Sequence, residues 1–306
     1  MRALAPGQAP WPAPLGSGAG GRAPWRPGIP FSLVHLCCLA APFVGWSPAA
    51  LGTCAAMYLV RMFGITAFYH RCFSHRAFRV PRAVQLVGAF LGAAAAQRGP
   101  LWWAAHHRRH HHLTDRPGDP HSPRQDGLAY SHLFWMFAPA NKPTDLGLVE
   151  DLARFPELRL IDRCHYAAPA LVALATFALG TFAGHAWPSA GVNGPQLLVW
   201  GFFVSTVLVY QATFAVNSLG HRWGRRSFDT PDDSRNIWWL ALATLGEGWH
   251  NNHHRFCSSA RSGFSAWQLD LTFWGIRLLE RLGLASQLRP VPAHLVGRPR
   301  PPGSRR

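Results

Sequence analysis

Four long apolar stretches restrict the possible folds of this chain more than any other feature of its sequence. They run from about Phe31 to Trp46, from Ala49 to Tyr69, from Tyr166 to Trp187 and from Gln196 to Val216. A helix needs about 20 residues, within a range of about 17–25, to cross the hydrocarbon core of a bilayer. The last three stretches reach that length, and the first does so only if it begins near Pro27. The chain contains only 14% charged residues and 48% hydrophobic residues. This composition favours membrane helices over the buried helices of a soluble protein.

The charges between these stretches predict their orientation. The two short connections, SPAA and PSAGVNG, carry no charge, whereas residues 70–165 carry thirteen Lys/Arg and the chain after His221 is also rich in arginine. Basic residues are retained on the cytoplasmic side of a membrane. We therefore expect an all-α membrane protein with four transmembrane helices in two hairpins. Both termini and a helical cap that carries the histidine motifs would be cytoplasmic.

Composition predicts the remaining organisation. Residues 1–28 are rich in Pro, Gly and Ala and lack an apolar period, which predicts a disordered tail. The membrane domain would occupy 29–290, and a basic disordered tail 291–306. A single lysine, Lys142, among 30 basic residues is typical of a GC-rich genome and suggests a bacterial plasma membrane. None of the six cysteines forms a CxxC pair, so no disulfide framework is expected.

The net charge of +16 would also suit nucleic-acid binding. Here, however, the arginines flank apolar stretches, and no basic stripe alternates with exposed aromatic residues. Membrane topology explains the charge better, so we expect no nucleic-acid partner.

Eight of the seventeen histidines fall in three boxes. HRCFSH contains His70 and His75, HRRHH contains His107, His110 and His111, and GEGWHNNHH contains His250, His253 and His254. Residues three and four apart share one helix face, so each of the last two boxes can aim three imidazoles at one point. The pair five apart diverges by about 140° on a regular α-helix and would reach one ion only if that ion lay between the two side chains.

Eight clustered imidazoles require an explanation. Charged rings would repel one another, and buried neutral rings would need partners. A metal ion accepts a lone pair from each neutral ring, and eight ligands exceed the capacity of one ion, so two ions are expected. A site of nitrogen ligands without cysteine suits iron, copper or zinc. The isolated histidines are expected to pack or to hydrogen-bond: His35, His132, His165, His185 and His294.

The three boxes, in this order between paired apolar stretches, resemble those of the membrane-bound fatty acid desaturases, and most closely the delta-9 acyl-CoA (stearoyl-CoA type) branch. GEGWHNNHH resembles the whole third box of that branch. NSLGH, with Asn217 and His221, resembles an Asn/His motif that follows its fourth helix, and GDPHSP at 118–123 resembles the stretch after its second box. The resemblance covers roughly residues 30–275.

This resemblance implies a centre of two iron ions. The first ion would take His70, His75, His107, His111 and His253, and the second would take His110, His221, His250 and His254. Asn217 would hold a water near the second ion. Glu247 is a plausible acceptor for the N–H of a ligand ring. Asp119 and His121 either act in the same way or serve as loop hydrogen-bonding residues.

The resemblance also implies an activity: the O₂-dependent introduction of a cis double bond, at delta-9, into a saturated fatty acyl chain. A mid-chain methylene has no polar handle, so acid–base side chains cannot remove its hydrogen, whereas an O₂-activating metal centre can. No segment resembles cytochrome b5 or ferredoxin. An external donor of either kind, with its reductase, is therefore expected, and the basic cytoplasmic face favours an acidic one.

An apolar tunnel between the membrane helices would position the acyl chain. Aromatic residues near the boxes suit its lining, as they also suit an interfacial belt: Phe68, Tyr69, Trp102, Trp103, Phe214 and Trp249. Tyr58, about three turns before His70, would limit the acyl length if it faces the tunnel. In QRGPLWWAAHH only Arg98 and His106 offer polar contacts, unlike the charged stretch of animal members. CoA, acyl carrier protein and phospholipid all stay open as carriers.

Three other functions fit part of this pattern. A fatty acyl or alkyl hydroxylase of the same histidine-box superfamily would share the iron ligands and insert oxygen. A metal transporter would place its ligands near the bilayer midplane, whereas these boxes lie beyond the apolar stretches. A membrane scaffold with surplus histidine would bind no metal and would tolerate a change at His110.

Overall fold

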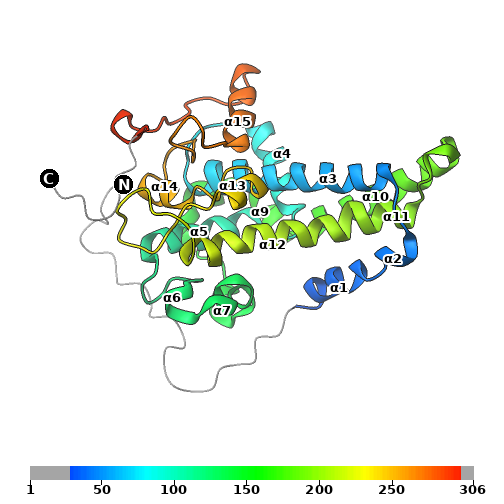
Figure 1. The fold of residues 1–306 in the computed structure, drawn as a ribbon, viewed down its shortest axis with the longest axis horizontal. Coiled ribbons are helices and arrows are strands. Elements are labelled where there is room, and N and C mark those ends of the chain that lie inside the picture. The colour runs from blue at the N-terminus through cyan, green and yellow to red at the C-terminus, as the bar shows by residue number, and fades with distance from the viewer. Residues whose placement is uncertain (1–27, 298–306) are drawn as a thin grey trace.

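A computed structural model describes residues 28–297, and these residues fold into helices joined by loops, with no β-strand. Figure 1 shows the long helices running along the long axis of the molecule, with α5, α13 and α14 gathered at one end. The predicted tail at 1–28 lies outside the described residues except for Gly28. The predicted tail at 291–306 lies partly within them, and its first part is ordered.

Three helices are long and apolar enough to cross a membrane: Pro48–Ser74, Ala167–Ala186 and Gly194–His221. The first combines α3 (Pro48–Phe63) with the π-helix η1 (Gly64–Ser74), and the second is α10 (Ala167–Ala186). The third joins α11 (Gly194–Leu198), the π-helix η6 (Val199–Val204), α12 (Ser205–Ser218) and the 3₁₀ turn η7 (Leu219–His221). These helices coincide with the last three predicted apolar stretches, and their length and composition suit membrane spans.

The first predicted membrane stretch does not form one helix. It divides into α1 (Ile29–Cys38) and α2 (Ala41–Val44), and neither is long enough to span a bilayer. Pro42 lies in the first turn of α2, where its ring excludes a continuous helix from Cys38 onward. Gly45 then adopts a φ of 65°, which turns the chain toward α3. Both short helices pack against η6, α1 also against α12, and α2 also against α11.

One short element, η5 (Pro188–Ala190), lies in the connection between α10 and α11. The other remaining elements form the end of the molecule that carries the histidine boxes. They are α4 (Arg82–Ala93), α5 (Pro100–Leu113), α6 (Pro123–Asp126), α7 (Leu128–His132), η2 (Phe134–Phe137), η3 (Pro139–Asn141), η4 (Leu146–Val149), α8 (Glu150–Ala153), α9 (Pro156–Arg163), α13 (Trp238–Ala243), α14 (His250–Arg255), α15 (Leu271–Arg281) and η8 (Ala293–Leu295). Of these, α5 holds the second box and α14 begins within the third.

The core fixes the first box against its neighbours. Phe68, Tyr69 and Phe73 of η1 are buried together with alanines of α4 and α5. Gly64 permits this packing, because a Cβ there would lie 2.6 Å from the backbone carbonyl carbon of Leu91. The π-helix therefore sits directly against the α4 backbone, which leaves it little freedom to shift.

The C-terminal prediction needs a correction. Val291 and Leu295 pack against Phe228 and Phe264 in a separate apolar cluster, so residues 291–297 are part of the folded domain. Only 298–306 of the predicted tail lie outside the described residues. The basic composition of the segment concealed two apolar side chains that are enough to anchor it.

Candidate metal centre

The structure brings the nine predicted histidines together in two groups at one end of the long helices. One group contains His70, His75, His107, His111 and His253, and the other contains His110, His221, His250 and His254. Within each group, one ring nitrogen from every member lies within 4.8 Å of the others, so each group could hold a metal ion. This division matches the one that the resemblance implied.

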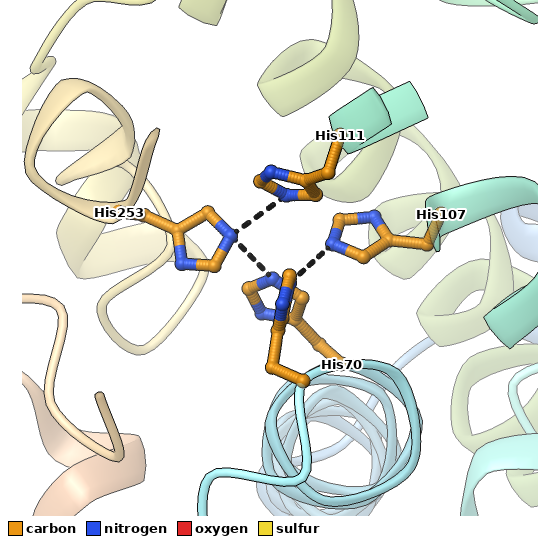
Figure 2. Close-up of side chains that lie close together, drawn as sticks. His70, His107, His111 and His253 are labelled. Carbon is orange, nitrogen blue, oxygen red and sulfur yellow. Dashed lines mark hydrogen bonds between the residues drawn. The ribbon is translucent and has the colours of Figure 1, made fainter. Parts of the chain in front are cut away.

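The ring nitrogens within each group are close enough to share an ion. In the first group, the Nε2 atom of His253 lies 3.1 Å from that of His70 and 3.0 Å from that of His111. The Nε2 atoms of His75 and His107 are 2.7 Å apart. Figure 2 shows the labelled rings of this group facing a common centre. In the second group, the Nε2 atoms of His221 and His250 are 2.9 Å apart.

The π-helix explains the spacing of the first box. Sequence reasoning assumed a regular α-helix, on which His70 and His75 diverge. In η1 the backbone follows the i→i+5 pattern, and the amide of His75 donates to the carbonyl oxygen of His70 at 3.1 Å. Residues five apart therefore stack on the same side of the helix. The two imidazole centroids consequently lie only 4.8 Å apart.

The second and third boxes each contribute to both groups. On α5, His107 and His111 are one turn apart and face the first group, while His110 turns toward the second. On α14, His253 joins the first group, and His250 and His254 join the second. Because two rigid helices carry ligands for both groups, the separation of the groups is fixed by helix geometry.

Four carboxylates lie beside the Nδ1 atoms of these rings. Glu247 is 2.6 Å from His70 Nδ1, Asp119 is 2.9 Å from His110 Nδ1, Asp115 is 2.9 Å from His221 Nδ1, and Asp232 is 3.1 Å from His254 Nδ1. A carboxylate that accepts the Nδ1 proton leaves the Nε2 lone pair free and fixes the ring orientation. The rings of His110, His221 and His254, whose Nδ1 atoms are hydrogen-bonded to these carboxylates, are thus prepared to bind through Nε2.

Sequence reasoning predicted Glu247 and weighed Asp119, but it missed Asp115 and Asp232. Asp115 follows the second box closely and lies 106 residues from His221, and Asp232 lies 22 residues from His254. The sequence did offer a signal for these two residues. The chain has only 14 Asp and Glu against 30 Lys and Arg, so each acidic residue is a candidate partner for a histidine. The His121 ring stacks on that of His110 with centroids 4.2 Å apart, and its Nδ1 is buried without a hydrogen-bond partner among the described residues.

The acidic partners are ionised in this setting. Burial alone would raise the pKa of Glu247, but the charges of His70 and Arg71 outweigh it and lower this pKa to about 2. The Arg71 guanidinium also donates to Glu247 Oε1 through Nε at 3.1 Å and through Nη2 at 2.9 Å. For Asp119, burial is again opposed, here chiefly by His110, and the pKa falls to about 2. These carboxylates therefore act as hydrogen-bond acceptors.

Four of the five rings of the first group are held neutral. Burial, followed by the neighbouring imidazoles, lowers the pKa of His75, His107, His111 and His253 well below the ordinary value. The same causes lower the pKa of His250 in the second group. For His110, burial acts in the same direction, but Asp119 outweighs it and raises the pKa, which makes the ring a more basic donor. Neutral imidazole is the form that binds metal.

The geometry fits metal ions at both positions. Two nitrogens bound at about 2.0–2.1 Å and at right angles to each other lie about 3 Å apart, which matches the Nε2 separations here. His110 Nε2 and His254 Nε2 are buried without a hydrogen-bond partner among the described residues, and both belong to the second group. Buried polar atoms in native proteins normally have a partner, so these two nitrogens indicate a ligand between them.

An apolar cavity of about 450 Å³ reaches the first group at His107. This volume lies within the ~300–1,000 Å³ range of small-molecule pockets. Its lining includes three of the predicted substrate residues, Arg98, Trp103 and Phe214. The Arg98 guanidinium lies 4.8 Å from the centroid of the Trp102 ring. Asn217 lines this cavity and also a second one of about 50 Å³, whose wall includes His107 of the first group and His110 of the second.

Two predicted substrate residues lie outside both linings. The Tyr58 hydroxyl donates to the carbonyl oxygen of Ala243 at 2.5 Å, so the side chain faces α13. The Trp249 indole donates to the carbonyl oxygen of Leu269 at 2.7 Å and packs edge-on against Trp267. In each case a backbone carbonyl satisfies the polar end of a buried ring. That Tyr58 limits acyl length stays a prediction.

Fold and site together define a class of helical proteins in which long apolar helices carry two histidine clusters beside an apolar cavity. The family model for fatty acid desaturase matches residues 45–282. With 38–39% identity to characterised desaturases over most of its length, this chain belongs to the fatty acid desaturase family. The sn-2 palmitoyl-lipid 9-desaturase of Nostoc sp. (strain 36) is 38% identical over 271 residues, covering 86% of this chain and 90% of that protein.

Two plant relatives differ in their named specificities. The acyl-CoA 5-desaturase AL21 of Anemone leveillei is 39% identical over 265 residues, covering 84% of this chain and 76% of that protein. The chloroplastic palmitoyl-monogalactosyldiacylglycerol delta-7 desaturase of Arabidopsis thaliana is 38% identical over 264 residues, covering 84% of this chain and 66% of that protein. Similar sequences in this family thus act at different positions and on different acyl carriers.

Proposed function

We propose that this protein is an O₂-dependent desaturase that introduces a cis double bond, at delta-9, into a saturated fatty acyl chain. The observation that carries the proposal is the pair of converging histidine groups beside an apolar cavity. When bound, two iron ions would supply the chemistry that reduces O₂ to two molecules of water, using two electrons from an external donor, two protons from solvent and two hydrogen atoms from adjacent methylenes. An unactivated C–H bond requires chemistry of this kind.

The donor set favours iron over structural zinc. Structural zinc sites are almost always tetrahedral with four ligands, often cysteine, whereas the first group offers five nitrogens and no sulfur. Nε2 separations near 3 Å correspond to ligands at right angles, as around a six-coordinate ion. The second group offers four nitrogens, and Asn217 at the nearby cavity wall would hold a water as a further ligand. All nine histidines would then be iron ligands.

The residues around the cavity would hold the substrate and exclude water. Trp103 stacks on His107 with centroids 4.9 Å apart, so it lies where an acyl chain would pass the first ion. Phe214 and Trp103 would confine the reacting methylenes through contacts that leave few alternative positions. Arg98 would contact the polar end of the substrate, because it is a cation in the lining of an otherwise largely apolar cavity.

We further propose the arrangement in the membrane. The broken pair α1–α2 would form a hairpin with α3, and α10 a hairpin with α11–α12, giving four membrane segments. The histidine groups and both termini would face the cytoplasm, as the distribution of arginine favours. An acidic ferredoxin or cytochrome b5-like protein, with its reductase, would deliver electrons to this basic face. CoA, acyl carrier protein and phospholipid stay open as acyl carriers, and the bacterial plasma membrane is the proposed location.

Expression in a desaturase-deficient bacterial host tests this function. We expect a new monounsaturated fatty acid whose double bond, located by mass spectrometry, lies at delta-9. His250→Ala should form none, because it removes one of the four nitrogens of the second group. A product that has gained one oxygen instead of losing two hydrogens would favour the hydroxylase. Unaltered host lipids, with the protein present and loaded with iron, would refute the proposal.

A further inference from the structure

Arg61 is a fully buried cation inside a membrane-spanning helix. It lies on α3 within the span Pro48–Ser74, and its relative exposure is 0%. Among the residues that the structure describes, no carboxylate forms an ion pair with it, unlike Arg71, which pairs with Glu247 and Asp270. Charged residues within membrane segments are costly and are usually retained for a function. Neither the metal centre nor the cavity lining uses Arg61 directly.

The guanidinium bridges α3 to the junction of η6 and α12. Its Nη1 donates to Thr206 Oγ1 at 2.5 Å, and its Nη2 donates to Ser205 Oγ and, at 3.5 Å, to the carbonyl oxygen of Gly201. Its Nε donates to the carbonyl oxygen of Met57, one turn earlier on α3. Only the planar fork of arginine can reach several acceptors on one neighbouring helix in this way.

The hydroxyls of Ser205 and Thr206 connect the Arg61 guanidinium to the backbone of the π-helix η6. Ser205 Oγ also lies 2.6 Å from the carbonyl oxygen of Gly201, and Thr206 Oγ1 lies 2.5 Å from that of Phe202. Both carbonyls belong to η6, where the i→i+5 pattern weakens the regular α-helical bonding. Arg61 and the two hydroxyls thus form a polar clamp on η6.

The clamped segment forms part of the cavity wall. Phe202 and Phe203 of η6 line the cavity that reaches His107, and the Arg61 guanidinium lies 5.7 Å from the centroid of the Phe202 ring. Phe203 precedes Asn217 by 14 residues in the same continuous helix. At about 1.5 Å per residue, the two phenylalanines lie about 20 Å from the metal end of the cavity. They are therefore placed to meet the methyl end of an acyl chain.

From this arrangement we infer that Arg61 is a positioning residue for acyl-chain selection. By holding η6 in its π-helical form, it keeps Phe202 and Phe203 at the deep end of the cavity and so sets how long a chain can enter. The inference rests on the proposed desaturase function. Without the clamp, η6 would relax toward an α-helix, and a shift of one residue turns a side chain by about 100° around the axis. The two rings would then leave the cavity wall, and longer chains would be accepted.

The variant Arg61→Met tests this inference. It keeps an unbranched stem, removes every donor, and suits a membrane helix, so the protein should still insert and fold. Cells would receive a mixture of palmitic, stearic and arachidic acids, and the ratio of longer to shorter desaturated products would be measured. We expect that ratio to rise by about tenfold, because one methylene in an apolar pocket changes selectivity by about 10–200-fold. Arg61→Lys, which keeps the charge without the fork, should shift it in the same direction.

Leu59→Ala is the matched control, since Leu59 lies on the same helix and is 48% exposed. It should leave the product ratio unchanged. A merely structural role for Arg61 would lower the total product without altering the ratio, and that result in a folded, iron-loaded Arg61→Met protein would overturn the inference. If the Arg61→Met protein fails to accumulate, Thr206→Val replaces it as the test, because it removes the Arg61 acceptor on α12. The same ratio of longer to shorter products is then measured. A wild-type protein that forms no desaturated product would overturn the proposed function, and this inference with it.

Discussion

Replacing His111 with alanine is expected to abolish desaturation, whereas replacing its neighbour His112 should leave desaturation intact. Both residues lie on α5, but His111 belongs to the five-nitrogen group, with its Nε2 3.0 Å from that of His253. His112 is exposed and belongs to neither group. Loss of a residue that only supports a ligand typically costs about 10–100-fold in metal affinity or activity, so loss of a ligand should cost more than 100-fold.

The measurement is the amount of new unsaturated fatty acid per amount of protein in a desaturase-deficient host, together with the iron content of each variant. His111→Ala should lose iron as well as product, while His112→Ala should match the wild type in both. Equal activity of the two variants would show that His111 is not a metal ligand on which desaturation depends.

Asp115→Asn is expected to lower activity by about 10–100-fold, the usual effect of removing a hydrogen-bond partner from a metal ligand. Asp115 Oδ2 accepts from His221 Nδ1 at 2.9 Å and from the backbone amide of Asp233 at 2.8 Å, and Oδ1 accepts from Ser122 Oγ at 2.7 Å. An asparagine keeps the shape but loses one acceptor oxygen and the charge. The orientation of His221 would then no longer be fixed.

Asp229→Asn serves as the control, because the Asp229 side chain is 84% exposed and approaches Arg226 only at 3.7 Å. Activity and bound iron should be measured for both variants alongside a thermal melt in detergent. The expected result is a reduced iron affinity for Asp115→Asn at a similar melting temperature, with Asp229→Asn unchanged. Normal iron binding and activity in Asp115→Asn would mean that His221 needs no acidic partner.

The sequence predicted those parts of the molecule that depend on local pattern. Three of the four apolar stretches form helices long enough to cross a membrane, as uninterrupted apolar length predicts. The shared face of residues three and four apart predicted one point for each of the α5 and α14 boxes, but each box divides its histidines between the two groups. The division of the histidines into two groups came from the family resemblance, because spacing within a box cannot say which distant box a ring will meet. The first stretch failed as a single helix because Pro42 interrupts it, a break that hydropathy alone does not register.

Other features depend on backbone form or on long-range pairing. The π-helical form of η1 brings His70 and His75 to one side, yet nothing in HRCFSH distinguishes a π-turn from an α-turn. Asp115 and His221 are 106 residues apart, so their contact exists only in the folded chain. The hydrogen bond from the Tyr58 hydroxyl to the carbonyl oxygen of Ala243 joins residues 185 apart, so the sequence could not predict it.

The most direct test of the central claim is the metal content of the active protein. We predict about two iron ions per chain in protein extracted from membranes, with activity rising in proportion to iron. His254→Ala, which leaves the five-nitrogen group complete, should reduce the ratio to about one. Full activity in protein that holds no iron, or a wild-type ratio that stays at one when iron is abundant, would contradict the two-ion centre.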